Sequence, residues 1–299
     1  MTMSQTLITS RDPKGLHAVG LFEAVYNKSK LNDVRAQQLN ERGGELQKGI
    51  AKLIAELSYQ YANEEIRSNH TYPKEYRGPK TINDQIMAIA EIFGLDSSHA
   101  LKFTKNLPVL PEGAEGWFAI PSVDALAAKH FPEVIDPAQK YCQAVQLVND
   151  NIATSRPFFN YRKGQTAPEN LRIHARTAHA LDLIAETQKG DILIIAAQLG
   201  MRHRGKSVRR AREVFVANEF GLGSLAVGSI VLTHPERIVR SEELEIGCPG
   251  DELTPENFGS FFWSPCFYFE RNGCMVCFDM YYYASHEDYY GFASAFLPQ

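Results

Sequence analysis

The stretch GDILIIAAQLGMRHRGKSVRRAREVF, residues 190–215, predicts a buried strand, a loop and a basic helix in succession. Residues 191–197 form a nearly continuous apolar run, with Gly190 before it and Gly200 shortly after it. A short apolar run bounded by glycines is typical of a strand that is buried on both faces. The stretch therefore predicts a strand–loop–helix unit whose loop and helix carry the charge.

The loop of this unit matches the phosphate-loop motif G-x-x-x-x-G-K-S through Gly200, Gly205, Lys206 and Ser207. In that motif backbone N–H groups wrap the phosphates, Lys reaches the outer ones and Ser binds Mg²⁺. The residues at positions 201–204 are bulky, whereas close wrapping of a phosphate favours small residues. Only 92 residues follow Ser207, a short length for the rest of a nucleotide-binding sheet. A magnesium-nucleotide cofactor is therefore expected only if this loop cradles phosphate.

The basic residues of the same stretch give a second signal. Six of the eleven residues 202–212 are Lys or Arg. A helix that starts near Ser207 offers free N–H groups to an anion, and guanidinium groups bind phosphate through paired hydrogen bonds. A preceding helix over residues 168–186 is expected to add a second basic face. The candidate ligand-binding residues are Arg172, Arg176, Arg202, His203, Arg204, Arg209, Arg210 and Arg212.

Charge is distributed unevenly along the chain, although the formal net charge is only −4. Residues 156–212 hold 12 Lys and Arg against 4 Asp and Glu, whereas residues 213–299 hold 3 against 13. The basic segment then either faces a polyanion or pairs with the acidic segment inside the fold. Both interpretations remain open at the level of sequence.

The sequence predicts an α+β protein with a helical region over residues 1–107 and a mixed domain over residues 114–299. A single apolar helix face runs through residues 46–57, and Thr81 with Asp84 forms a capping box. Gly43 and Gly44 are expected to break the first helices apart. The segment LPVLPEGAEGW, residues 107–117, is rich in Pro and Gly and marks the expected boundary.

The second region contains helix, strand and hairpin signals. Asp136 followed by Pro137 predicts a helix start. Residues 219–232 are ambiguous, since their glycines weaken a helix but permit close packing. Asn272 and Gly273 lie between two aromatic-rich runs, which strongly indicates a β-hairpin.

Composition and cysteine usage narrow the class of protein. The start of the chain lacks the pattern of a signal peptide, and its longest apolar run is too short to span a bilayer. Five sparse cysteines indicate buried thiols in a reducing cytoplasm. Cys274 and Cys277 would point to opposite faces of a strand, so no metal site is predicted. Acidic candidates for phosphodiester chemistry, or for pairing with the arginines, are Glu213, Glu219, Asp251 and Glu252.

Three functions follow from these patterns. The first is binding of a phosphate-rich ligand, with nucleic acid favoured, through the basic strand–loop–helix. The second is a nucleotide-binding or nucleotide-hydrolysing enzyme that uses the loop at residues 200–207, with His203 as a candidate acid or base. The third is a structural or interaction protein whose basic segment pairs with its acidic C-terminal region.

Overall fold

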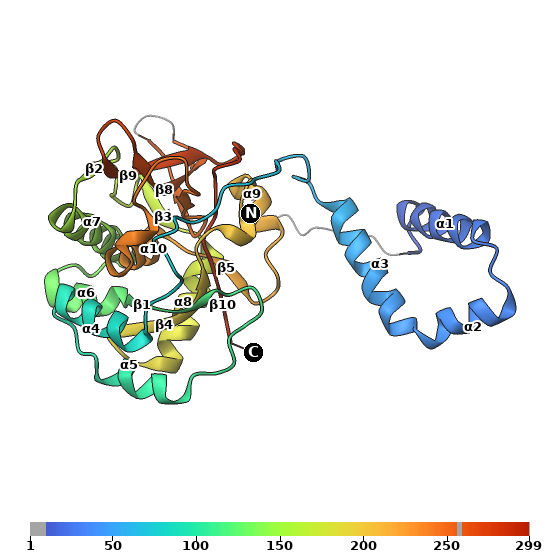
Figure 1. Ribbon diagram of the computed structural model, residues 1–299, viewed down its shortest axis with the longest axis horizontal. Helices are drawn as coiled ribbons and strands as arrows, with labels where there is room; N and C mark the ends of the chain where they lie inside the picture. Colours follow the sequence, from blue (N-terminus) through green and yellow to red (C-terminus); the bar gives the residue numbers. More distant parts are fainter. Residues whose placement is uncertain (1–9, 256–258, 299) are drawn as a thin grey trace. The chain divides into compact units, whose positions relative to one another are not determined.

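The computed structural model describes residues 10–255 and 259–298, and its contacts divide the chain into two compact units (Figure 1). The units are residues 1–60 and residues 61–299. Helices gather mainly toward the N-terminus and strands toward the C-terminus, which confirms the α+β class. The division at residue 60 precedes the boundary expected at residues 107–114, and that two-domain assignment stays a prediction.

The N-terminal unit consists of three helices that bury none of their apolar side chains against one another. Asn32 caps the second helix by accepting a hydrogen bond from the backbone N–H of Arg35. The break between the second and third helices falls at Arg42, so the two following glycines begin the third helix instead of separating it. The helices are α1 (Pro13–Lys28), α2 (Asp33–Glu41) and α3 (Gly43–Ser58).

The unit of residues 61–299 opens with an extended strap, residues 61–80, followed by helices α4 (Ile82–Phe93) and α5 (Ser98–Phe103). The predicted cap of α4 is confirmed, because the Thr81 hydroxyl accepts the backbone N–H of Asp84. Helix α4 contacts the strands β1 (Gly116–Pro121) and β4 (Ile192–Gln198), and α5 contacts β4. Contacts therefore cross the Pro- and Gly-rich segment that the sequence marks as a boundary.

A four-stranded antiparallel sheet lies in the order β1–β4–β10–β5. Its second strand is the apolar run predicted to be a buried strand, and every residue of that strand is buried. The neighbouring strand β1 pairs with it from Gly116 opposite Ala197 to Pro121 opposite Ile192. The four strands are β1 (Gly116–Pro121), β4 (Ile192–Gln198), β5 (Glu219–Gly221) and β10 (Ser294–Phe296).

A second sheet lies in the order β2–β9–β8–β7–β3, with β6 also paired to β8. The predicted hairpin is confirmed as β8 and β9, which pair from Trp263 opposite Tyr282 to Glu270 opposite Met275. Asn272 and Gly273 occupy its turn. The strands are β2 (Phe158–Asn160), β3 (Leu171–Ile173), β6 (Ile246–Gly247), β7 (Asp251–Leu253), β8 (Trp263–Glu270) and β9 (Met275–Tyr282).

The remaining helices complete the core of this unit. Asp136 caps α7 through the backbone N–H of Gln139, as its position before Pro137 predicts. Helix α10 contacts α7, β1 and β8, and a Cβ atom at its Gly228 would lie only 2.6 Å from Val148. These helices are α6 (Val123–His130), α7 (Pro137–Ser155), α8 (Ala175–Gln188), α9 (Val208–Glu213) and α10 (Ser224–Thr233).

The start of one predicted helix differs from the structure. The helix expected over residues 168–186 begins only at Ala175, because residues 171–173 form β3 and pair with β7. Arg172 therefore lies on a strand, and it does not share a helix face with Arg176. The basic helix is α9, a helix of six residues. Within the described residues, no helix is both long enough and apolar enough to cross a membrane.

Candidate functional site

The candidate site is the segment that joins β4 to α9, together with the side chains packed around it. The loop at residues 200–207 sends its backbone N–H groups to several separate acceptors. The N–H groups of Gly200 and Arg202 donate to the side-chain oxygen of Gln198, at 2.7 and 3.3 Å. The N–H group of Gly205 donates to the carbonyl of Tyr290 at 2.8 Å. These donors do not converge on one point, which favours a structural role for the loop over a phosphate cradle.

The two side chains that would contact a nucleotide also have protein partners. The Ser207 hydroxyl donates to Glu64 at 2.7 Å and caps α9 by accepting the N–H group of Arg210. The ammonium group of Lys206 lies 3.9 Å from the carboxylate of Glu65. Burial lowers the pKa of Lys206, which the nearby Glu65 opposes. Neither side chain is held ready for magnesium or phosphate in this geometry.

The strap before α4 supplies the carboxylates for the first arginines of α9. The Nε atom of Arg209 donates to Glu64 at 2.6 Å, and a second nitrogen of the same guanidinium bonds the other oxygen. The guanidinium of Arg210 lies 2.9 Å from Glu65 and 3.2 Å from Glu213. These pairs join segments that are 145 residues apart, except for the local pair with Glu213. They fasten the strap onto α9.

The last arginine of α9 bonds to the second sheet. Arg212 donates to the carbonyls of Pro249 and Asp251, both at 2.9 Å, and lies 3.2 Å from Glu252. Arg172 on β3 shares the same carboxylate at 2.8 Å. Pairing with the acidic segment, residues 213–299, is therefore present for these two arginines and, through Glu213, for Arg210. The carboxylate that pairs with Arg209 comes from the strap.

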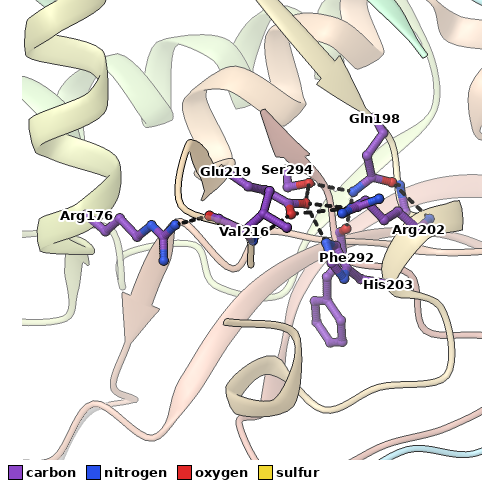
Figure 2. Close-up of polar contacts among 9 residues, drawn as sticks. Arg176, Gln198, Arg202, His203, Val216, Glu219, Phe292 and Ser294 are labelled. Atoms are coloured by element: carbon purple, nitrogen blue, oxygen red, sulfur yellow. Dashed lines mark hydrogen bonds and ion pairs between the residues drawn. The ribbon is translucent and has the colours of Figure 1, made fainter. Parts of the chain in front are cut away.

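The most buried charged group of the site is Glu219 on β5, whose side chain is fully buried. Figure 2 shows its polar contacts. Glu219 accepts hydrogen bonds from Nε of Arg202 at 3.2 Å, from His203 at 2.6 Å and from the Ser294 hydroxyl at 2.6 Å. The backbone N–H of Val216 adds a fourth donor at 3.2 Å. Burial raises the pKa of Glu219, but these donors more than offset it and the pKa lies below its ordinary value. Glu219 is therefore an ionised carboxylate.

His203 is held in one protonation state by the same contacts. Its Nε2 atom faces Glu219, whereas its Nδ1 atom is buried without a hydrogen-bond partner. Protonation of Nδ1 would bury an unpaired N–H group and a charge, and burial lowers the pKa of this imidazole. His203 is consequently a neutral donor to Glu219. The imidazole is buried, and its ring centroid lies 5.0 Å from that of Phe215.

Two predicted ligand-binding arginines donate to backbone carbonyls. Arg176 on α8 donates to Val216 and Ala217 (Figure 2), and Arg204 donates to the carbonyl of His70 at 3.0 Å. Within the described residues neither guanidinium pairs with a carboxylate.

The candidate site as a whole brings together eight cationic residues and five paired carboxylates, which leaves an excess of three positive charges. The cations are Arg172, Arg176, Arg202, Arg204, Lys206, Arg209, Arg210 and Arg212, and the carboxylates are Glu64, Glu65, Glu213, Glu219 and Glu252.

Sequence reasoning missed the side chains that complete this site. Glu64 and Glu65 lie in the extended strap, and Gln198 and Ser294 lie on strands of the first sheet. None of these residues lies within a recognisable motif, because their roles depend on pairing between distant segments. The described residues also contain no group of three His, Cys, Asp or Glu side chains that could hold a metal ion.

Known proteins give no guide to this site. Comparisons with family models, with curated proteins and with solved structures each find no match.

Proposed function

We propose that this chain is a structural or interaction protein in which the basic segment stabilises the fold through ion pairs within the chain. The observation that carries the proposal is that each arginine of α9 already donates to a carboxylate of the same chain. A guanidinium bound in this way must give up charge-assisted hydrogen bonds before it can hold a phosphate. The pairs are Arg209 with Glu64, Arg210 with Glu65 and Glu213, and Arg212 with Glu252.

The test compares two Arg–Glu pairs that differ in burial. We expect Arg209→Ala to lower the free energy of unfolding by about 2 kcal/mol, because Glu64 then keeps only Ser207 as a side-chain donor among the described residues. The matched control is Arg271→Ala, since Arg271 and Glu242 form an exposed pair whose loss changes stability by less than about 0.5 kcal/mol. Urea-induced unfolding measures both. Equal stability of wild type and Arg209→Ala would remove the structural role.

The N-terminal unit carries the surface through which we propose that the chain interacts. No described residue from position 10 to position 60 is buried, although α1 and α3 are rich in apolar residues. On α3 the residues Leu46, Ile50, Leu53 and Leu57 are spaced by four, three and four positions. This spacing is the seam of a coiled coil, with Leu at both d positions and Ile50 at one of the two a positions, and Ile at a with Leu at d favours two strands. The proposed occupant of this face is a second copy of the chain.

Light scattering coupled to size-exclusion chromatography of the full chain tests this self-association. We expect a dimer for the wild type and for Lys48→Glu, which changes the opposite face of α3. Leu53→Glu places a charge in the seam and is expected to give a monomer. A monomeric wild type, or a dimer that survives Leu53→Glu, would exclude α3 as the contact between copies.

Binding of a phosphate-rich ligand, with nucleic acid favoured, is the second candidate function. The excess of three positive charges favours it, with Arg176, Arg204 and Lys206 as the residues least neutralised. Fluorescence anisotropy with an oligonucleotide should then show affinity that falls steeply with salt and that Arg204→Ala weakens. Affinity that is absent, or insensitive to salt, removes this candidate. A magnesium-nucleotide site at residues 200–207 lacks such support, because its amide groups bond to protein acceptors.

A cytoplasmic location belongs to the same proposal. All five cysteines are free thiols, and four of them are buried. Free thiols are typical of proteins in a reducing compartment.

A further inference from the structure

A cleft of about 700 Å³ lies beside Arg202, away from the ion pairs of α9. Residues 108–112, Arg202 and residues 216–218 line it, and all of them belong to the unit of residues 61–299. Small-molecule sites have volumes of about 300–1,000 Å³. The cleft is therefore large enough for a small organic ligand.

Most of the lining is apolar and exposed. Val109 is 91% exposed and Val216 is 43% exposed, so both present their side chains to solvent. Pro108, Leu110 and Ala217 extend this apolar surface. Exposed apolar side chains around a hollow gain free energy when a ligand covers them. The body of a fitting ligand is consequently aliphatic.

Arg202 provides the cationic group of the cleft. Its Nε atom donates to both oxygens of Glu219, at 3.2 and 3.3 Å, and its side chain is 33% exposed. Its Nη1 atom lies close to Gly113, where a Cβ atom would come within 2.8 Å at a φ of +95°. Among the described residues, neither terminal nitrogen of this guanidinium makes a hydrogen bond. One edge of the guanidinium is fixed, and its terminal N–H groups are available to a ligand.

Glu219 fixes this arginine at a cost in solvation. A fully buried carboxylate loses its hydration, and here Ser294, His203 and the Val216 N–H group replace the lost water (Figure 2). Two of the partners of Glu219 also line the cleft, and of them Val216 contributes only its backbone N–H group, whereas Arg202 contributes a charged side chain. The arrangement resembles a supporting shell that orients a single binding group.

The charges around the cleft decide the class of anion. Arg202 and Arg176 lie near it, and Arg176 holds the wall by donating to the carbonyls of Val216 and Ala217. Glu112 on the rim and Glu219 beneath balance these two cations. A doubly charged phosphate is disfavoured by this balance, whereas a single carboxylate matches the terminal N–H groups of one guanidinium. We infer that the cleft binds a small monocarboxylate with an aliphatic body.

Titration with 4-methylpentanoate tests the inference, with binding followed by NMR of the full chain. The neutral 4-methylpentanamide is expected to bind at least about tenfold more weakly, because it lacks the charge that Arg202 recognises. Inorganic phosphate is expected not to displace the carboxylate. Equal binding of the amide, displacement by phosphate, or no binding of 4-methylpentanoate would each overturn the inference.

Three variants locate the binding on the protein. Arg202→Gln is expected to weaken 4-methylpentanoate binding by about tenfold or more. Because this variant also leaves Glu219 without its cation, Ala217→Trp serves as a second test that fills the cleft and spares the ion pair. Arg240→Gln, which removes an exposed arginine outside the cleft, is the control and should bind like wild type. Binding that survives Ala217→Trp would place the carboxylate elsewhere and overturn the inference.

Discussion

Glu219 on β5 and Asp251 on β7 are both fully buried carboxylates, yet their pKa values move in opposite directions. The pKa of Glu219 lies below its ordinary value, whereas that of Asp251 rises from 3.8 to about 6. Burial raises the pKa in both cases. The partners of each group therefore decide the outcome.

The difference lies in the donors, because Glu219 accepts hydrogen bonds from His203 and Ser294 and also from the cation Arg202. Arg202 bonds directly to the carboxylate of Glu219, at 3.2 Å. Asp251 accepts the hydroxyl of Tyr141 at 2.6 Å and both the hydroxyl and the N–H of Ser224 at 2.5 and 2.6 Å, all of which are neutral donors. Arg212 lowers the pKa of Asp251 only through its charge, because it bonds to the backbone carbonyl instead. Neutral donors alone do not offset full burial.

The largest expected effect comes from removal of the negative charge. We expect Glu219→Gln to lower the free energy of unfolding at pH 7 by about 3 kcal/mol, since Arg202 and its neighbours lose a charged acceptor. Asp251→Asn should cost only about 1 kcal/mol, because no cation bonds to its carboxylate and the Tyr141 hydroxyl can accept from the new amide. Urea-induced unfolding at pH 7 gives both values. Equal costs would show that the bonded cation does not separate the two sites.

Acid is expected to change these two costs in opposite directions. The folded pKa of Asp251, about 6, exceeds its value of 3.8 in the unfolded chain. Its contribution to stability is therefore fully present below pH 3.8 and is lost as the pH rises through about 6. The contribution of Glu219 is present above its unfolded value of 4.5 and is lost as the pH falls through its lowered pKa.

Unfolding measured at pH 4 and at pH 7 checks this expectation. Asp251→Asn should cost about 2 kcal/mol more at pH 4 than at pH 7, whereas Glu219→Gln should cost less at pH 4. Glu245, whose pKa burial raises to about 7, titrates in the same range. It is present in the wild type and in both variants, so its contribution cancels in the differences. Parallel changes of the two costs would contradict the assignment of charge to Glu219.

Local signals explain which parts of the fold were predictable from the sequence. Thr81, Asp136 and the Asn272–Gly273 pair each act within four residues, and the structure places a cap, a cap and a hairpin turn at them. The start of α8 was not predictable in this way. Leu171 fits the helical spacing of the residues that follow, but it forms a strand because it pairs with Leu253. Pairing at that separation leaves no trace in the local pattern.

The same distinction between local signals and long-range pairing applies to the candidate site. Its cations were visible in the sequence because they lie together in one run, and pairing with carboxylates was one of the two interpretations of the charge imbalance. The particular acceptors were not visible. Glu64 meets Arg209 across 145 residues, and Ser294 reaches Glu219 across 75 residues. A loop motif likewise records spacing, but not whether its amide groups meet a ligand or, as at Gly205, a carbonyl of the protein.

The smallest expected effect comes from removing one hydroxyl donor from each of the two carboxylates. Tyr141→Phe and Ser294→Ala both remove a neutral donor and should each cost about 1 kcal/mol. Their effects on charge should differ, because Glu219 keeps Arg202 and His203 as donors, whereas Asp251 keeps Ser224 as its only side-chain donor among the described residues. Loss of the Tyr141 hydroxyl removes a group that lowers the pKa of Asp251, so this pKa should rise from about 6 toward the pH of the measurement. Carbon-13 NMR of the labelled carboxyl groups at pH 7 should then show a larger protonated fraction of Asp251 in Tyr141→Phe, and an ionised Glu219 in Ser294→Ala. A protonated Glu219 in Ser294→Ala would mean that Arg202, His203 and the Val216 N–H group together do not hold its charge.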